Sequence, residues 1–213
     1  MEIYDISMQI DYNMPVYKGK ESKRPLLEVE KDFDNSDIFE SKISMNMHTG
    51  THIDSPLHML KGGKSIQETE PEKMINKCRV LDLVHVKEKI TKKDLESETI
   101  IEGEFVLLKT KNSFEDLLEG EFIYLDSDGA EYLKEKKIVG VGIDGLGIER
   151  NCKEHTTHKI LLSQGISIIE GLRLKQVASG EYVLLAAPLN IKGAEASPVR
   201  ALLIEGSFNL NRL

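Results

Sequence analysis

One short stretch of the 213-residue chain decides how the remainder is interpreted. It reads His48-Thr49-Gly50-Thr51-His52-Ile53-Asp54-Ser55-Pro56-Leu57-His58. Three imidazoles and a carboxylate fall within these eleven residues, and no thiolate lies among them. Neutral imidazole nitrogens and carboxylate oxygens are ligands that zinc and manganese accept in proteins. The stretch therefore predicts a metal site, and we expect hydrolysis as its chemistry.

The local backbone is predicted to be extended. A glycine, Pro56 and two threonines make a regular helix improbable between the histidines. Alternate side chains of an extended segment share a face, so His48, His52 and Asp54 are expected to point the same way. Pro56 then turns the chain, and His58 lies beyond the turn, free for another role.

Two further segments downstream supply candidate ligands. Residues 154–162 contain His155 and His158 and are predicted to be helical, ending before a glycine. The apolar run 166–169 is followed by Glu170. A carboxylate that closes a buried strand requires a cation, so Glu170 is a candidate metal ligand.

These residues carry a resemblance to a known family. The chain resembles the metal-dependent cyclase family, which includes bacterial kynurenine formamidase and isatin hydrolase. The signature of that family is His-x-Gly-Thr-His-x-Asp-x-Pro-x-His, and residues 48–58 match every fixed position. The similarity extends over nearly the whole chain, at Asp5-Ile6-Ser7, Pro15-Val16-Tyr17-Lys18-Gly19, Gly140-Val141-Gly142-Ile143-Asp144, His158 with Glu170, Ala187-Pro188-Leu189 and Ser197-Pro198-Val199-Arg200.

The resemblance implies roles for individual residues. Two divalent metal ions, zinc or else manganese, would be held by His48, His52, Asp54, His158 and Glu170. The first three would hold one ion, Asp54 and Glu170 would bridge to the second, and His158 would ligate the second. His58 would be the proton shuttle. Tyr17 falls where formamidases place an aromatic substrate contact, usually tryptophan, although this chain contains no tryptophan.

The predicted function is a metal-dependent hydrolase that cleaves a C–N bond of a small amide, a formamide like N-formylkynurenine or a lactam like isatin. The nucleophile would be a metal-bound hydroxide, because zinc lowers the pKa of water from about 15.7 to about 7. His58 would take the proton of the attacking water and return it to the leaving nitrogen. Two alternatives remain: a metal-dependent lyase or cyclase acting on a carbonyl compound, and a non-catalytic module that binds a metal or a small carboxylate.

Composition favours one intracellular domain over residues 1–213. The net charge of −8 and the pI near 5.4 argue against a nucleic-acid partner, and no basic stripe is present. No leader pattern and no apolar run long enough for a membrane span is found, so we expect a cytoplasmic protein without a membrane partner. Cys78 and Cys152 stand alone, which fits a reducing compartment. By family resemblance we expect a homodimer or homotetramer.

The pattern of strands and helices predicts an α/β fold with a mixed, barrel-like sheet and flanking helices. The resemblance implies the swivelling β/β/α arrangement. Predicted strands are 1–10, 41–47, 80–86, 105–109, 123–125, 138–144, 166–169, 182–189 and 199–204, and a capped helix begins at residue 127.

Several residues receive no catalytic role. His85 is predicted to be an ordinary strand residue, and His155 lies either at the surface or behind a ligand. The glycines of 140–147 do not match a phosphate-binding loop, because the third glycine and the helix are lacking. Asp144 closes a strand, where it either orients a ligand histidine or caps the next turn.

Overall fold

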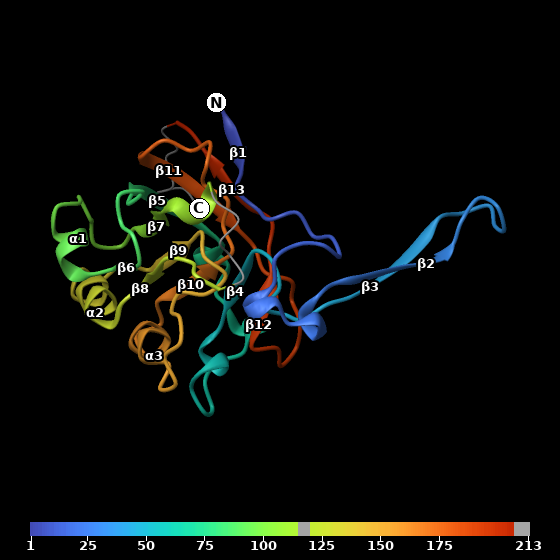
Figure 1. Cartoon of the computed structure of the whole chain (residues 1–213), viewed down its shortest axis with the longest axis horizontal. Coiled ribbons are helices and arrows are strands. Elements are labelled where there is room, and N and C mark those ends of the chain that lie inside the picture. Colours follow the sequence, from blue (N-terminus) through green and yellow to red (C-terminus); the bar gives the residue numbers. More distant parts are fainter. Residues whose placement is uncertain (115–119, 207–213) are drawn as a thin grey trace.

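The computed structural model describes residues 1–114 and 120–206, and its main element is one large mixed sheet (Figure 1). Within these residues the sheet has nine strands in the order β1-β13-β11-β5-β7-β9-β10-β4-β12. The strands are β1 (Ile3–Asp5), β4 (His52–Asp54), β5 (Ile75–Asp82), β7 (Phe105–Lys109), β9 (Gly140–Ile143), β10 (Ser167–Glu170), β11 (Gly180–Ala186), β12 (Ala196–Pro198) and β13 (Ala201–Ile204).

The direction of the strands divides the sheet into a parallel centre and antiparallel flanks. Strands β5, β7, β9 and β10 run parallel to one another. The outer strands pair antiparallel on both sides. The sheet curls into a half-barrel, which confirms the predicted α/β class with a mixed, barrel-like sheet.

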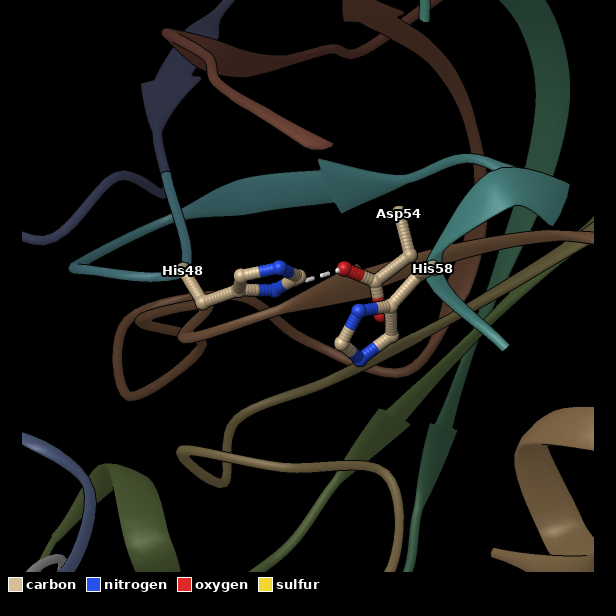
Figure 2. A group of neighbouring side chains, drawn as sticks. All are labelled: His48, Asp54 and His58. Atoms are coloured by element: carbon tan, nitrogen blue, oxygen red, sulfur yellow. Dashed lines mark ion pairs between the residues drawn. The ribbon is translucent and has the colours of Figure 1, made fainter. Parts of the chain in front are cut away.

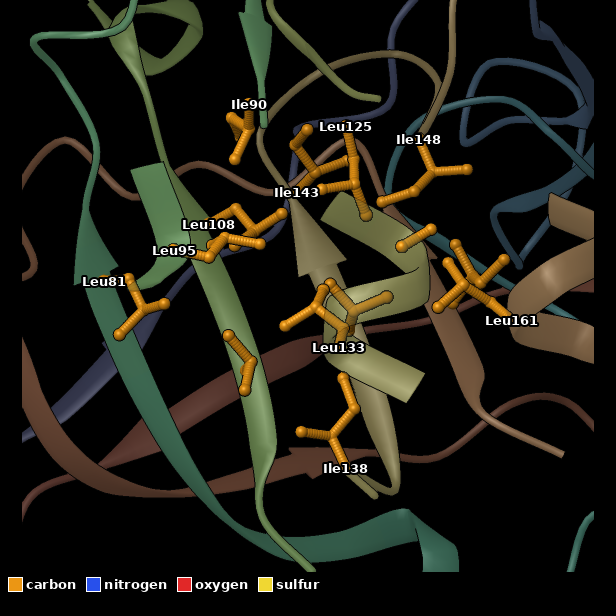
Figure 3. Close-up of a cluster of buried hydrophobic side chains, with 14 of the residues drawn as sticks. Leu81, Ile90, Leu95, Leu108, Leu125, Leu133, Ile138, Ile143, Ile148 and Leu161 are labelled. Carbon is orange, nitrogen blue, oxygen red and sulfur yellow. The ribbon is translucent and has the colours of Figure 1, made fainter. Parts of the chain in front are cut away.

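Three α-helices in the described residues cover one face of the sheet: α1 (Lys92–Glu96), α2 (Ser127–Glu135) and α3 (Thr156–Leu162). Figure 3 shows the apolar core between these helices and the strands. Because side chains alternate along a strand, Val106 and Leu108 of β7 enter this core, whereas Phe105 and Leu107 enter a second core on the opposite face.

The glycines of β9 make room for the second core. A Cβ atom on Gly140 would lie 2.0 Å from the ring of Phe105, and one on Gly142 would lie 2.6 Å from a methyl group of Leu107. These glycines therefore allow β7 side chains to pack across the strand, which explains the glycine pattern without a phosphate ligand.

Strands β2 (Leu26–Lys31) and β3 (Glu40–Ser44) form a hairpin that projects far from the body of the molecule (Figure 1). We call residues 26–44 the arm. Every residue of the two strands is exposed. Its large apolar side chains are 48–74% exposed: Leu26, Leu27, Val29, Phe33, Ile38, Phe39 and Ile43.

The remaining elements are short. Strands β6 (Lys89–Ile90) and β8 (Tyr124–Leu125) form a parallel pair. The 3-10 turns are η1 (Tyr17–Gly19), η2 (Glu21–Lys23), η3 (Pro56–His58), η4 (Ile66–Glu68), η5 (Pro71–Met74) and η6 (Lys111–Ser113). Among the described residues, no helix combines the length and the apolar character that crossing a membrane requires.

Several predicted strands differ in extent from the observed ones, most of all those at 1–10 and 80–86. The strand predicted for residues 1–10 is limited to β1, because only Ile3–Asp5 pairs with β13. The strand predicted for 80–86 is displaced to β5, which ends at Asp82. His85 therefore lies exposed in a turn and is not a strand residue.

Candidate metal centre

Strand β4 carries two of the predicted ligands on one face. His52 and Asp54 flank Ile53, whose side chain enters the second core on the opposite face of the sheet. Strand β4 pairs antiparallel with β10, and the register places His52 opposite Glu170. His52, Asp54 and Glu170 are 1%, 2% and 5% exposed. The pairing of β4 and β10 thus brings three buried donors together from positions far apart in the sequence.

His48 reaches the same place from the turn that precedes β4. Its Nδ1 lies 3.0 Å from Asp54 Oδ1, and its Nε2 lies 3.2 Å from Glu195 Oε1. Figure 2 shows the rings of His48 and His58 close to the Asp54 carboxylate. The predicted extended geometry is correct for 52–54, whereas His48 converges on Asp54 because of the turn.

Helix α3 delivers His158 from the opposite direction. Its Nε2 lies 3.2 Å from Glu170 Oε1 and 3.6 Å from Asp54 Oδ2. Its Nδ1 pairs with Glu149 Oε1 at 2.5 Å, and the other oxygen of Glu149 accepts a hydrogen bond from Thr157 N. Glu149, which the sequence did not single out, therefore fixes the ring so that Nε2 faces the carboxylates.

Several buried polar atoms at the centre of this cluster have no hydrogen-bond partner. Among the described residues these include His52 Nε2 and both carboxylate oxygens of Asp54. His52 Nδ1 bonds to the carbonyl of Gly50, so in the neutral ring Nε2 presents a lone pair. The Nε2 atom of His52 lies 3.3 Å from Glu170 Oε2. Buried nitrogen and oxygen donors that converge in this way favour a cation between them, and a divalent metal ion fits.

The pKa shifts agree with this requirement. Burial and the charge of Asp54 raise the pKa of Glu170, but contacts with His158 and His52 outweigh them and hold it at about 2. Burial lowers the pKa of His158, yet its contacts with Asp54, Glu149 and Glu170 raise it well above the usual range. The buried carboxylates therefore stay ionised, and positive charge beside them, on His158 or on a bound metal ion, stabilises them.

His58 lies on η3 beside the cluster. The centroid of its ring is 4.1 Å from that of His48 and 5.5 Å from that of His158. Burial, together with the neighbouring imidazoles, lowers the pKa of His58 to about 4. The ring is therefore neutral at pH 7 and can accept a proton.

A cavity of about 390 Å³ opens onto this cluster. Its lining includes His58 and His158, together with the predicted substrate contact Tyr17. The Tyr17 ring packs 6.1 Å from that of Phe122, measured between centroids. Lys23, which the sequence analysis did not single out, also lines the cavity.

His155 and Asp144 are the two residues whose role the sequence left open. His155 is an exposed residue whose Nδ1 lies 3.4 Å from Glu149, so it stands behind the His158 ligand position. The buried Asp144 carboxylate accepts hydrogen bonds from Thr110 and Ser113. It therefore organises the turn after β7, the strand beside its own, and orients no histidine.

The fold and this donor set define a metal-dependent hydrolase. Residues 4–150 match the family model described as "Putative cyclase", and the chain belongs to that family, as its signature predicted.

Three relatives illustrate the similarity. Kynurenine formamidase of Bacillus thuringiensis subsp. konkukian is 32% identical over 208 residues, which cover 95% of this chain and 97% of the relative. A solved structure described as a potential metal-dependent hydrolase with cyclase activity is 47% identical, with a TM-score of 0.90, covering 97% of this chain and 99% of that one. Isatin hydrolase A of Labrenzia aggregata is 25% identical, with a TM-score of 0.83, covering 96% and 94%.

Proposed function

We propose that the protein hydrolyses a C–N bond of a small non-peptide amide, formamide or lactam. The observation that carries the proposal is the cluster of buried, unpartnered metal donors with the neutral imidazole of His58 beside it. The relatives named kynurenine formamidase and isatin hydrolase support the choice of a C–N bond.

The proposed ligand set is the predicted one. His48, His52 and Asp54 would hold one divalent ion, and Asp54 and Glu170 would bridge to a second, which His158 completes. One donor atom from each of His52, Asp54 and Glu170 lies within 4.8 Å of the others, which supports a shared centre. Nitrogen and oxygen donors without thiolate favour zinc or manganese.

His58 is the proposed proton shuttle. Bound divalent ions would lower the pKa of a water molecule and polarise a carbonyl oxygen. The neutral His58 ring would accept the proton of the attacking water. The resulting imidazolium can then protonate the leaving nitrogen. An amine anion is a poor leaving group, so C–N cleavage needs this proton.

His58 also has a second candidate role. One of its ring nitrogens lies within 4.8 Å of ligand atoms of His48 and Asp54, a spacing that would also suit a third ligand. Metal content separates the two roles, because a His58→Ala variant keeps its metal only if His58 is a shuttle.

Hydrolysis assays test the proposed reaction. The metal-loaded protein is assayed on N-formylkynurenine and on isatin, before and after chelation and after zinc or manganese is returned. We expect turnover of at least one substrate that is lost on chelation and restored by metal. Turnover that persists in chelator would contradict the metal dependence, and inactivity on all small amides and lactams would contradict the reaction.

We also propose that the chain works as a homodimer or homotetramer, in which the arm packs against a second copy. An isolated two-stranded hairpin is only marginally stable in water, and the arm exposes a row of large apolar side chains.

A single domain over residues 1–213 is also proposed. One sheet contains strands from both ends of the chain, β1 and β13, which supports this proposal. We retain the cytoplasm as the proposed location.

A further inference from the structure

Lys23 occupies a distinct position in the cavity above the metal donors. It is the last residue of η2, immediately before the arm, and lines the cavity of about 390 Å³ together with His58 and His158. Of the described residues that line this cavity, only Lys23 is a lysine or arginine. Its ammonium is thus the one lysine or arginine charge that this lining offers to a molecule bound there.

The ammonium of Lys23 makes neither a hydrogen bond nor an ion pair in the described part of the chain. Its Nζ lies over the face of Tyr17, 5.6 Å from the ring centroid. By contrast, the buried Lys109 donates to the carbonyl of Val177 at 2.6 Å. Burial lowers the pKa of the half-buried Lys23, and the charges of Glu170 and Asp54 offset part of that effect. A bound anion would give the ammonium a direct partner.

The other walls of the cavity suit an aromatic group. The Tyr17 ring stands beside Lys23, and the apolar side chains of Met59 and Leu146 also line the space. An aromatic ring packs favourably against such surfaces. The carboxylates Asp54 and Glu170 would repel an anion on their own, but divalent ions bound to them would reverse that effect.

We propose that Lys23 and Tyr17 form a subsite for an aromatic carboxylate, so that the substrate is an N-acylated aryl amine whose ring carries a carboxylate group. This inference rests on the proposed amide hydrolysis and specifies its substrate class. The carboxylate pairs with Lys23, the ring lies against Tyr17, and the amide carbonyl extends towards His58.

The test compares two substrates that differ only in the carboxylate: N-formylanthranilate and formanilide. For the metal-loaded Lys23→Met variant, we expect KM for N-formylanthranilate to rise about tenfold, because one charge-assisted contact is lost. The value of kcat should change less than about twofold. KM for formanilide should not change. Lys23→Arg should restore most of the discrimination. The backbone contacts of residue 23, with Lys20 and Thr49, do not involve the side chain, so the variant is expected to fold.

Lys18 provides the matched control. Its Nζ lies 5.3 Å from the same Tyr17 ring, but Lys18 is exposed and does not line the cavity. Lys18→Met should therefore leave both KM values unchanged. Equal KM changes for the two substrates in Lys23→Met, or equal effects of the two lysine variants, would overturn the subsite.

Calorimetry separates failure of the subsite from failure of the proposed reaction. Anthranilate, the product analogue, should bind metal-loaded protein, and Lys23→Met should weaken its binding about tenfold, whereas aniline should not distinguish the proteins. If neither formamide is hydrolysed but anthranilate binding depends on Lys23, the reaction is wrong and the subsite stands. If anthranilate does not bind, or binds equally to both proteins, the subsite is wrong.

Discussion

The metal-donor cluster and the arm depart from the usual distribution of side chains in opposite directions. In the cluster, polar atoms of His52 and Asp54 are buried without hydrogen-bond partners. In the arm, Phe33 and Phe39 are 74% and 57% exposed, and their rings contact mainly each other, 6.1 Å apart. Folding alone stabilises neither arrangement, because the first buries several charged and polar groups close together and the second leaves apolar surface in water.

Each region is therefore proposed to be completed by a partner outside the single chain. A bound metal ion would supply positive charge to the cluster. A second copy of the chain is proposed to cover the apolar side chains of the arm. The two regions share no residues, so a variant in one is expected to leave the other intact.

The largest effect is expected for His58→Ala. General acid–base catalysis contributes about 100- to 10,000-fold, so kcat should fall by that factor. The metal content should not change, because His58 is proposed to move protons only. Steady-state kinetics and elemental analysis of the same preparation give both values. Full activity would remove His58 from the mechanism, and loss of metal would make it a ligand.

Removal of the metal should lower the stability of the folded protein and leave its self-association unchanged. A ligand that binds only the folded state, held at about 1,000 times its Kd, stabilises by about 4 kcal/mol. For a chain of this length that corresponds to about 8 to 16 °C in Tm. Thermal unfolding with and without chelator measures the shift. Asp54→Asn is the control, and a chelator effect of equal size in that variant would contradict the assignment.

Glu149→Gln should weaken metal binding without abolishing it. The substitution removes the charge that holds His158 but keeps the shape of the side chain at position 149. Contacts that support a metal ligand in this way contribute about 10- to 100-fold to metal affinity. Competition with a chelator of known affinity measures the change. Glu154→Gln, an exposed neighbour, should bind metal as the original protein does. Equal affinities for both variants would show that Glu149 does not support the ligand.

The smallest effect on activity is expected from the arm. Replacing Phe39 by Ser should raise the self-association Kd about 10- to 100-fold, the worth of one buried aromatic side chain. Metal content should be unchanged. Light scattering over a concentration series measures the assembly. Ile101→Ser removes an exposed apolar residue on the body and should have no effect. A monomeric original protein would contradict the role of the arm.

The sequence predicted those parts of the fold whose pattern is local. The predicted bounds of strand β7 agree with the structure, because residues 105–108 are a continuous apolar run and both faces of the strand are buried. The strand now assigned as β5 was misplaced, since its first residues are largely exposed and carry no alternation. The first strand of the arm was missed for the same reason, because neither of its faces is buried.

The candidate metal site likewise contains residues that the sequence predicts and residues that it does not. The dense motif at 48–58 predicts three ligands and the proton shuttle His58, and the position of Glu170 after an apolar strand predicts a further ligand. Glu149, Glu195 and Lys23 gave no signal, because each reaches the site by tertiary contact. Glu195 meets His48 across 147 positions of sequence. The pairing of β4 with β12 brings Glu195, which directly precedes β12, close to His48.

The metal stoichiometry of the protein tests the central claim most directly. Elemental analysis is performed on the protein and on Asp54→Asn, each purified without added metal and then reconstituted with zinc or manganese. The account predicts about two ions per chain in the protein, since Asp54 and Glu170 are proposed to bridge two sites, and a loss of both ions in the variant. No bound metal after reconstitution, or equal content in the two proteins, would contradict it.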